Sequence, residues 1–203
     1  MPFFTRQVTT EKDALAAYAA QQIHQLATTL IGLDDEQIRA TPTASDMSLA
    51  SLARHCLYVG NDGLLATTVD PSRAETHGTG DISAGEPLAA GIRPEDTSES
   101  LIEALEDMAR WVENLVPTLD MDSRVEKPDA PWYPQDLESW PMRWVVLHYV
   151  EEYARHAGHA DIIRQSIDGK IAYELNALAD GEPWPPEDWG KEWDAWIEGR
   201  QGD

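Results

Sequence analysis

One stretch of the chain is the most informative about the fold: His148-Tyr149-Val150-Glu151-Glu152-Tyr153-Ala154-Arg155-His156-Ala157-Gly158-His159. It contains three of the six histidines and follows a run of apolar residues, which indicates a helix with one polar stripe. Because an α-helix turns by about 100° per residue, Glu152 and His156 lie one turn apart on one face, flanked by His148 and His159. Buried polar groups without a partner cost several kcal/mol, and a divalent metal suits a Glu/His pair at this spacing best. A third ligand is therefore expected elsewhere in the chain.

The candidate third ligand is His55, in the segment Leu49-Ala50-Ser51-Leu52-Ala53-Arg54-His55. Helical spacing places His55 on the same face as Leu52. Two helices of a bundle can bring one histidine and a Glu/His pair together, and three protein ligands leave room on the metal for water or substrate. The alternative is a core histidine that hydrogen bonds to a backbone carbonyl, which is the commoner case for a lone histidine. A metal site shared with Glu152 and His156 explains all three residues at once.

The remainder of the chain predicts an all-α protein. Apolar residues recur at helical spacing in four segments, which predict helices from Thr10 to near Gly32, from Ser48 towards Leu65, from Thr97 to before Pro117, and from Ser139 to Gly169, with Pro141 in the first turn of the last helix. The two long connections between these helices, Asp70 to Asp96 and Asp120 to Glu138, have no hydrophobic period, and no strand pair is expected. Long connections of this kind are typical of a four-helix bundle with crossover loops.

The predicted domain organisation is one bundle over residues 1–175 and a C-terminal extension over residues 176–203. The extension is rich in tryptophan, with Trp184, Trp189, Trp193 and Trp196 among prolines and acidic residues. The last three of these tryptophans follow i, i+4, i+7 spacing, which predicts a short helix that packs on the bundle.

The charge of the chain excludes some classes of function. Lys and Arg number 15 against 37 Asp and Glu, which gives a net charge of −22. Nucleic-acid binding and docking on anionic membranes both depend on basic residues, so neither is expected. The chain has no apolar run of about 18 residues, no signal-peptide pattern at its start, and a single cysteine, Cys56, which is expected to pack in the core. A soluble cytoplasmic protein is expected.

Two motifs resemble those of a known superfamily. The segment Glu152-Tyr153-Ala154-Arg155-His156-Ala157-Gly158-His159-Ala160-Asp161-Ile162-Ile163-Arg164, followed by Ile167-Asp168-Gly169, resembles the fourth-helix signature of the DinB-like superfamily. It is most similar to the branch that includes mycothiol-dependent S-transferases and the metal-binding domain of maleylpyruvate isomerase. The run Ser48-Leu49-x-x-Leu52-x-x-His55 resembles the second-helix motif of the same family, and the resemblance spans roughly residues 10 to 170.

The resemblance implies a DinB-like four-helix bundle that holds a divalent metal, zinc or alternatively nickel. The matching ligand positions are His55, Glu152 and His156. Many relatives have histidine where this chain has Glu152, and the glutamate form is associated with the mycothiol branch. A homodimer is an expectation from the fold.

The implied function is a metal-dependent thiol S-transferase, in which the metal activates a low-molecular-weight thiol such as mycothiol for attack on an electrophilic small molecule. His159 is expected to act beside the metal as a relay for a proton. Two alternatives remain open. The same three-ligand site could activate water in a metal-dependent hydrolase, or the chain could be a non-catalytic metal-binding module of a stress response.

Several other residues have simpler expected roles. His148 is expected to line a pocket or to be satisfied in the core, and Trp132 or Trp140 to rim a pocket. At least one of Asp161 and Arg164 is expected to form an ion pair within the bundle.

Overall fold

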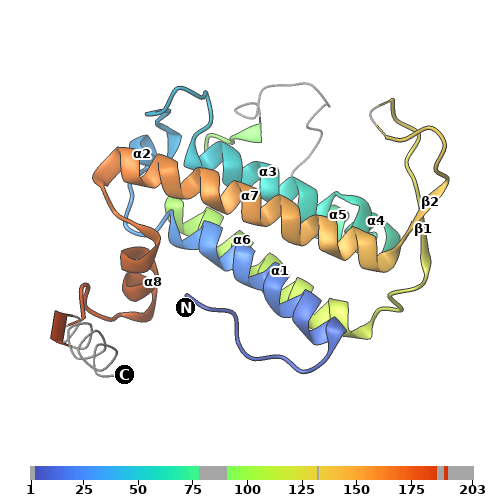
Figure 1. The fold of residues 1–203 in the computed structure, drawn as a ribbon. Coiled ribbons are helices and arrows are strands. Elements are labelled where there is room, and N and C mark those ends of the chain that lie inside the picture. Colours follow the sequence, from blue (N-terminus) through green and yellow to red (C-terminus); the bar gives the residue numbers. More distant parts are fainter. Residues whose placement is uncertain (1–2, 78–90, 132, 187–189, 192–203) are drawn as a thin grey trace.

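The computed structural model describes residues 3–77, 91–131, 133–186 and 190–191 (Figure 1). The described residues are mostly helical, which confirms the prediction of an all-α class apart from one small sheet. In chain order the elements are α1 (Glu11–Thr28), α2 (Asp35–Arg39), α3 (Leu49–Asn61), α4 (Leu64–Val69), α5 (Ser72–His77), α6 (Ser98–Leu115), the 3-10 helix η2 (Val116–Thr118), β1 (Arg124–Glu126), β2 (Ser139–Pro141), α7 (Met142–Asp168) and α8 (Ala172–Asp180).

The four long helices α1, α3, α6 and α7 lie side by side (Figure 1). Helix α1 packs against α6 and α7, and α3 packs against the same two helices from the other side. Each helix contributes fully buried apolar side chains to one continuous core, including Leu26, Leu52, Leu105 and Val146. Burial of this shared apolar surface is the dominant favourable term in folding, and it holds α3 directly against α7.

Three of these helices begin at a polar N-cap residue, at the position that the sequence predicts. The hydroxyl oxygens of Thr10, Ser48 and Thr97 accept hydrogen bonds from backbone N–H groups three residues later. Such caps satisfy donors that have no partner inside the helix. At the other end of α7, Gly169 has a φ of 81°, the left-handed conformation that glycine adopts without a steric penalty.

The second predicted helix is shorter than expected, because α3 ends at Asn61 and α4 begins at Leu64. A Cβ atom on Gly63 would lie 2.1 Å from the backbone oxygen of Val59, so the chain can turn this tightly only at a glycine. The hydroxyl of Tyr149 donates to the oxygen of Val59 at 2.7 Å and accepts from the nitrogen of Leu65 at 3.2 Å. Helix α7 therefore holds the break between α3 and α4 in place.

The expectation that no strands pair is wrong. Strands β1 and β2 form an antiparallel pair in which Val125 faces Trp140. Ser139 therefore belongs to a strand, and Pro141 caps α7 instead of lying in its first turn. Strands of three residues are too short to show the alternation by which a strand is predicted from sequence.

Helix α8 follows α7 after a short turn and packs on α1. The side-chain amides of Asn176 and Gln25 exchange two hydrogen bonds, of 2.9 and 2.8 Å. The predicted boundary after residue 175 thus falls inside α8. The helix predicted around Trp189, Trp193 and Trp196 lies outside the described residues.

The described helices include none that combines the length and the apolar character needed to cross a bilayer.

Candidate metal centre

Helices α3 and α7 bring His55, Glu152 and His156 together. Nε2 of His55 lies 2.9 Å from Oε1 of Glu152, and Nε2 of His156 lies 3.3 Å from the same oxygen. One donor atom from each of the three side chains lies within 4.8 Å of the other two. The two imidazole rings meet edge to face, with their centroids 4.7 Å apart. Residues that are nearly a hundred positions apart in the chain thus converge as the sequence predicts.

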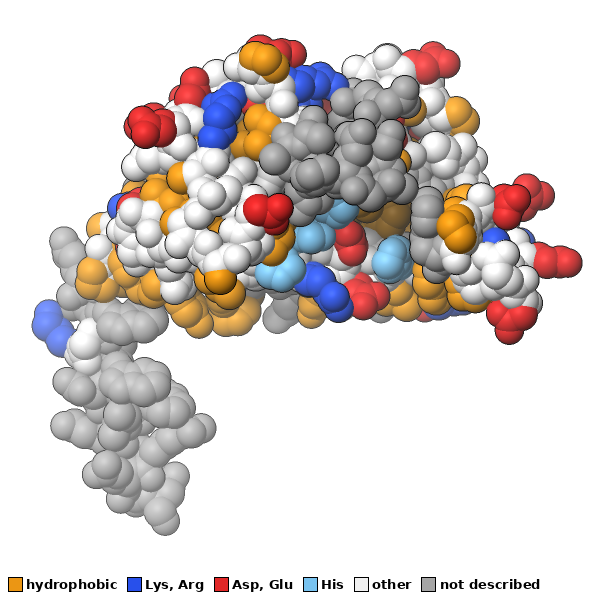
Figure 2. All heavy atoms as spheres, turned by 90° about the horizontal axis from the view of Figure 1, so that it is seen from above, with side chains coloured by type: hydrophobic (Ala, Val, Ile, Leu, Met, Phe, Trp, Pro, Cys, Tyr) orange, Lys and Arg blue, Asp and Glu red, His pale blue; other side chains and the backbone are white. Residues whose placement is uncertain are grey.

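The site lies in a hollow of the surface and is partly buried. Figure 2 shows histidine and carboxylate side chains gathered in this hollow. The side chains of His55 and Glu152 are each about a quarter exposed, at 25% and 24%, and that of His156 is 12% exposed. A small molecule can therefore reach the three groups from one side.

The electrostatics of the site keep Glu152 ionised. Hydrogen bonds from His156 and His55 hold the pKa of this carboxyl well below its usual range, although burial opposes the shift. At neutral pH the centre therefore presents one carboxylate oxygen and two imidazole nitrogens, which is the donor set that zinc and nickel accept.

The spacing of these donor atoms fits a single ion. In a tetrahedral zinc site with bonds of about 2.0 Å, neighbouring ligand atoms are roughly 3.3 Å apart. The contacts from Glu152 to the two histidines are 2.9 and 3.3 Å, so only small side-chain movements are needed. The residues present thus fit a divalent metal on both donor chemistry and distance.

The other two histidines of the stripe lie beside the three converging residues. Nδ1 of His159 lies 3.4 Å from Nδ1 of His156, on the side of that ring away from Glu152. His148 is nearly half exposed, and its ring stacks on Trp144 at a centroid distance of 5.2 Å. A helical stripe of three turns is about 16 Å long, so its ends cannot all reach one ion.

Cys56 follows His55 in the chain but points into the core. It is fully buried, and burial raises the pKa of its thiol well above the ordinary value. A thiol of this kind stays protonated and unreactive at neutral pH. The predicted packing role of Cys56 is confirmed.

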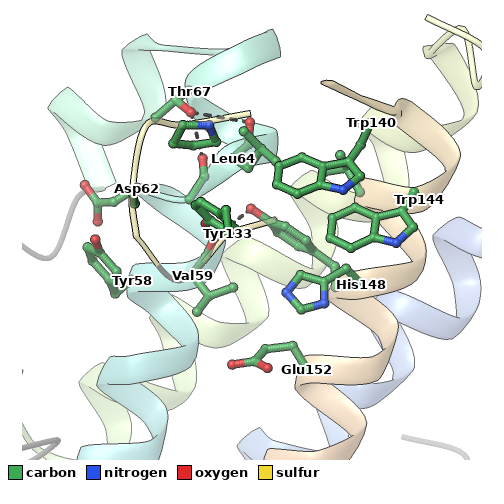
Figure 3. A pocket seen from close by; sticks show the side chains of 15 residues that line it. Tyr58, Val59, Asp62, Leu64, Thr67, Tyr133, Trp140, Trp144, His148 and Glu152 are labelled. Atoms are coloured by element: carbon green, nitrogen blue, oxygen red, sulfur yellow. Dashed lines mark hydrogen bonds between the residues drawn. The ribbon is translucent and has the colours of Figure 1, made fainter. Parts of the chain in front are cut away.

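A cavity of about 440 Å³ reaches the candidate metal centre at Glu152, which is part of its lining. Helix α7 supplies Trp144 and His148 to one side of it, and Trp140 of β2 lies next to them, as Figure 3 shows. These residues and Glu152 follow one another at intervals of four positions in the sequence. This spacing could have identified them as one side of a cavity. The other side comes from the end of α3, from α4 and from the loop before β2, and sequence periodicity did not reveal it.

The ion pair that is expected for at least one of Asp161 and Arg164 is formed by Arg164. Arg164 is almost fully buried and pairs with Asp168, one turn further along α7, at 2.9 Å. It also donates hydrogen bonds to the backbone oxygens of Thr29 and Ile31, at 2.8 and 2.9 Å. This arginine thus ties the end of α7 to the turn that follows α1.

Asp161 lies instead in a second hollow, between α1, α7 and the N-terminal segment. Burial raises the pKa of its carboxyl to about 6, because the charged form loses contact with water. The hollow is on the side of α7 opposite to Glu152, so this carboxyl takes no part in the candidate metal centre.

We expect Asp161→Asn to stabilise the protein at about pH 7 by about 1 kcal/mol, a figure reduced for partial solvent exposure, and to have little effect at about pH 4. The folded protein binds a proton at Asp161 between the ordinary pKa of 3.8 and the raised value of about 6, whereas the unfolded chain does not. The stability that the protonated Asp161 contributes is therefore lost as the pH rises from 3.8 to about 6, and it stays lost at higher pH. Urea unfolding across this range measures the difference.

The matched control for this substitution is Asp136→Asn, at an exposed loop position. It should leave the stability unchanged at every pH. A difference between Asp161→Asn and wild type that does not vary with pH would contradict the assignment.

The fold and the site together define a helical protein with a two-histidine, one-carboxylate candidate metal centre between two long helices. Comparison with protein families gives a match to the mycothiol-S-transferase family over residues 14–169. The match includes all three candidate ligands and runs from α1 to the end of α7. The chain therefore belongs to the mycothiol-S-transferase family, which confirms the resemblance seen in its motifs. Searches of curated proteins and of solved structures find no match.

Proposed function

We propose that this protein is a metal-dependent mycothiol S-transferase with a DinB-like four-helix bundle. His55 from α3, with Glu152 and His156 from α7, would hold one divalent cation, zinc or alternatively nickel. The observation that carries the proposal is the convergence of these three donors within 4.8 Å, in a chain of the mycothiol-S-transferase family. Three protein ligands leave positions on the cation for a substrate.

When bound, a divalent cation supplies a positive centre that lowers the pKa of a thiol, so that the thiolate is present near neutral pH. In the transfer, the thiol loses its proton and its sulfur forms a bond to the electrophilic carbon, while the leaving group departs with the bonding electron pair. Glu152 contributes the one negative charge of the ligand set. The three side chains are partly exposed in a hollow of the surface, through which the reactants would approach.

His159 would position His156. Its Nδ1 lies 3.4 Å from Nδ1 of His156, the ring nitrogen that does not face Glu152. Histidine ligands commonly use this second nitrogen in a hydrogen bond that fixes their tautomer and orientation. In this contact Nδ1 of His159 is already a hydrogen-bond acceptor, so the proton that the thiol releases would pass to solvent on the open side of the hollow.

Two alternatives predict different chemistry at the same residues. A hydrolase would use water in place of the thiol, and a non-catalytic module would bind metal without turnover. The family match favours transfer over both.

A thiol-addition assay on the zinc-loaded protein tests the proposal. We expect faster conjugation of an electrophile with mycothiol than with glutathione, and loss of this acceleration when the metal is chelated. His159→Asn should keep the bound metal and the KM for mycothiol but lower kcat. A rate that chelation does not change, or consumption of the electrophile without thiol, would contradict the transferase assignment.

A further inference from the structure

The cavity beside the candidate metal centre has the features of a binding site for a flat ring. We propose that it binds the electrophile, and that it selects an aromatic electrophile without negative charge. That the occupant is the electrophile rests on the proposed function. That the cavity prefers a flat ring without negative charge rests on its lining alone. The volume of about 440 Å³ lies in the range of roughly 300–1,000 Å³ that is typical of small-molecule sites.

One side of the cavity is a stack of three rings that leads to Glu152. The indoles of Trp140 and Trp144 are stacked at a centroid distance of 4.6 Å with 7° between their planes. The ring of His148 continues the stack from Trp144 at 5.2 Å and 12°. Each step is four residues along the chain, from Trp140 in β2 to Trp144 and His148 in α7, and Glu152 takes the next position on the helix. A ring held against this stack would lie next to the metal ligands.

The facing side is mainly apolar. Figure 3 shows Tyr133, Val59 and Leu64 opposite the stack. The ring of Tyr133 meets Trp140 edge to face at 5.3 Å, which closes the end of the cavity furthest from Glu152. Trp144 remains 39% exposed, so part of its indole is available to a ligand. Aromatic rings prefer stacked or edge-to-face neighbours, and these walls offer both.

The charge of the lining disfavours anions. Its charged residues are Asp62 and Glu152, both acidic, and no lysine or arginine occurs among the described residues that line the cavity. The chain as a whole carries a net charge of −22. A negatively charged electrophile would lose its hydration here without gaining an opposite charge from the lining. The charge of a divalent cation at the centre would already be balanced by Glu152 and the thiolate, so burial of the anion costs free energy.

The same lining is poorly suited to the sugar-linked part of mycothiol. Hydroxyl groups need hydrogen-bond partners when they leave water. Two hydroxyls of the lining are already engaged, because Tyr149 bonds to Val59 and Leu65, and Thr67 donates to the oxygen of Gly63. The electrophile is therefore the better occupant, and the thiol must approach from the open side of the hollow.

Binding of an unreactive ring tests the site without any turnover. The probe is 1,3-dinitrobenzene, a flat neutral ring that has no leaving group, titrated into the zinc-loaded protein by calorimetry in the absence of thiol. We expect Trp144→Leu to weaken its binding by about fivefold to tenfold, because the exposed edge of the indole, which a ring can meet edge to face, is lost. Trp144→Phe should retain most of the affinity, since it keeps a ring. Equal affinities for wild type and Trp144→Leu would overturn the proposal.

The matched control is Tyr18→Leu, which removes a half-exposed ring from α1, away from this cavity. It should bind the probe as wild type does. If Tyr18→Leu weakened binding as much as Trp144→Leu, the effect would not come from the cavity, and the proposal would fail.

Kinetics with reactive probes then identify the occupant. We expect Trp144→Leu to raise the KM for 1-chloro-2,4-dinitrobenzene by more than it raises that for iodoacetamide, which has no ring, while leaving the KM for mycothiol unchanged. The anionic ring 4-chloro-3,5-dinitrobenzoate should be a poor substrate of the wild type. An increase in the KM for mycothiol instead would assign the cavity to the thiol and overturn the proposal. If no electrophile is turned over although the dinitrobenzene binds through Trp144, the proposed function fails and the ring site stands.

Discussion

Substitution of His156 by alanine is expected to remove the bound metal and to abolish thiol transfer. His156 supplies one of the three converging donors and also contributes a hydrogen bond to Glu152. Because removal of even an outer partner of a metal ligand lowers affinity by about 10- to 100-fold, loss of a ligand should reduce affinity by about 100-fold or more. Elemental analysis of the purified variant, with an isothermal titration of zinc, measures this effect.

The chain offers a closely matched control for this substitution. His24 and Glu106 form another histidine–carboxylate pair, with Nδ1 and Oε1 2.9 Å apart and side-chain exposures of 20% and 22%. His24→Ala removes a histidine from a pair of similar burial but leaves the candidate ligands untouched. It should retain metal and transferase activity. Full metal content in His156→Ala, with its folding confirmed by circular dichroism, would rule out this set of ligands.

The second large effect is on stability. Arg164→Met is expected to lower the free energy of unfolding by about 3 kcal/mol, because it removes the buried partner of Asp168, which keeps only Lys170, and leaves two backbone oxygens without their donor. The arginine is 1% exposed and holds the end of α7 against the backbone after α1. Methionine has a similar volume, so the loss comes mainly from the missing hydrogen bonds. Urea unfolding at about pH 7 measures the change.

Arg155→Met is the control for Arg164→Met, on the same helix. The guanidinium of Arg155 lies on the surface, 66% exposed and 3.8 Å from Glu151. Surface ion pairs of this kind contribute little, so this variant should unfold as wild type does. A similar loss of stability in both variants would show that the bonds of Arg164 to Thr29 and Ile31 are not what stabilises the fold.

The candidate ligands could be predicted because the pattern that indicates them lies within one or two helical turns of sequence. Glu152 and His156 are one helical turn apart, and the interruption of an apolar stripe by polar residues is visible without any structure. His55 could be added because it occupies an apolar face of a second predicted helix. The family motifs pointed to the same three residues, and the distances between their donor atoms agree with that choice.

The sequence did not specify the partners of the neighbouring residues, because these depend on which side chains meet. Arg164 pairs with Asp168 and not with Asp161, although both acids lie near it in the chain. His159 contacts His156 and not Glu152. A rotation of a few tens of degrees about a helix axis decides between such neighbours, and periodicity is not accurate enough to resolve it.

The amino-acid sequence by itself determined the helical class, the helix starts at Thr10, Ser48 and Thr97, and the three residues of the candidate metal centre. These follow from contacts within one or two helical turns, which the order of residues specifies directly. Only the tertiary structure decided the break at Gly63, the pairing of β1 with β2, and the cavity between α3, α4 and α7. Each of these depends on how closely segments far apart in the chain approach one another. Burial of apolar surface drives that approach, but it is non-directional and does not by itself specify which segments meet.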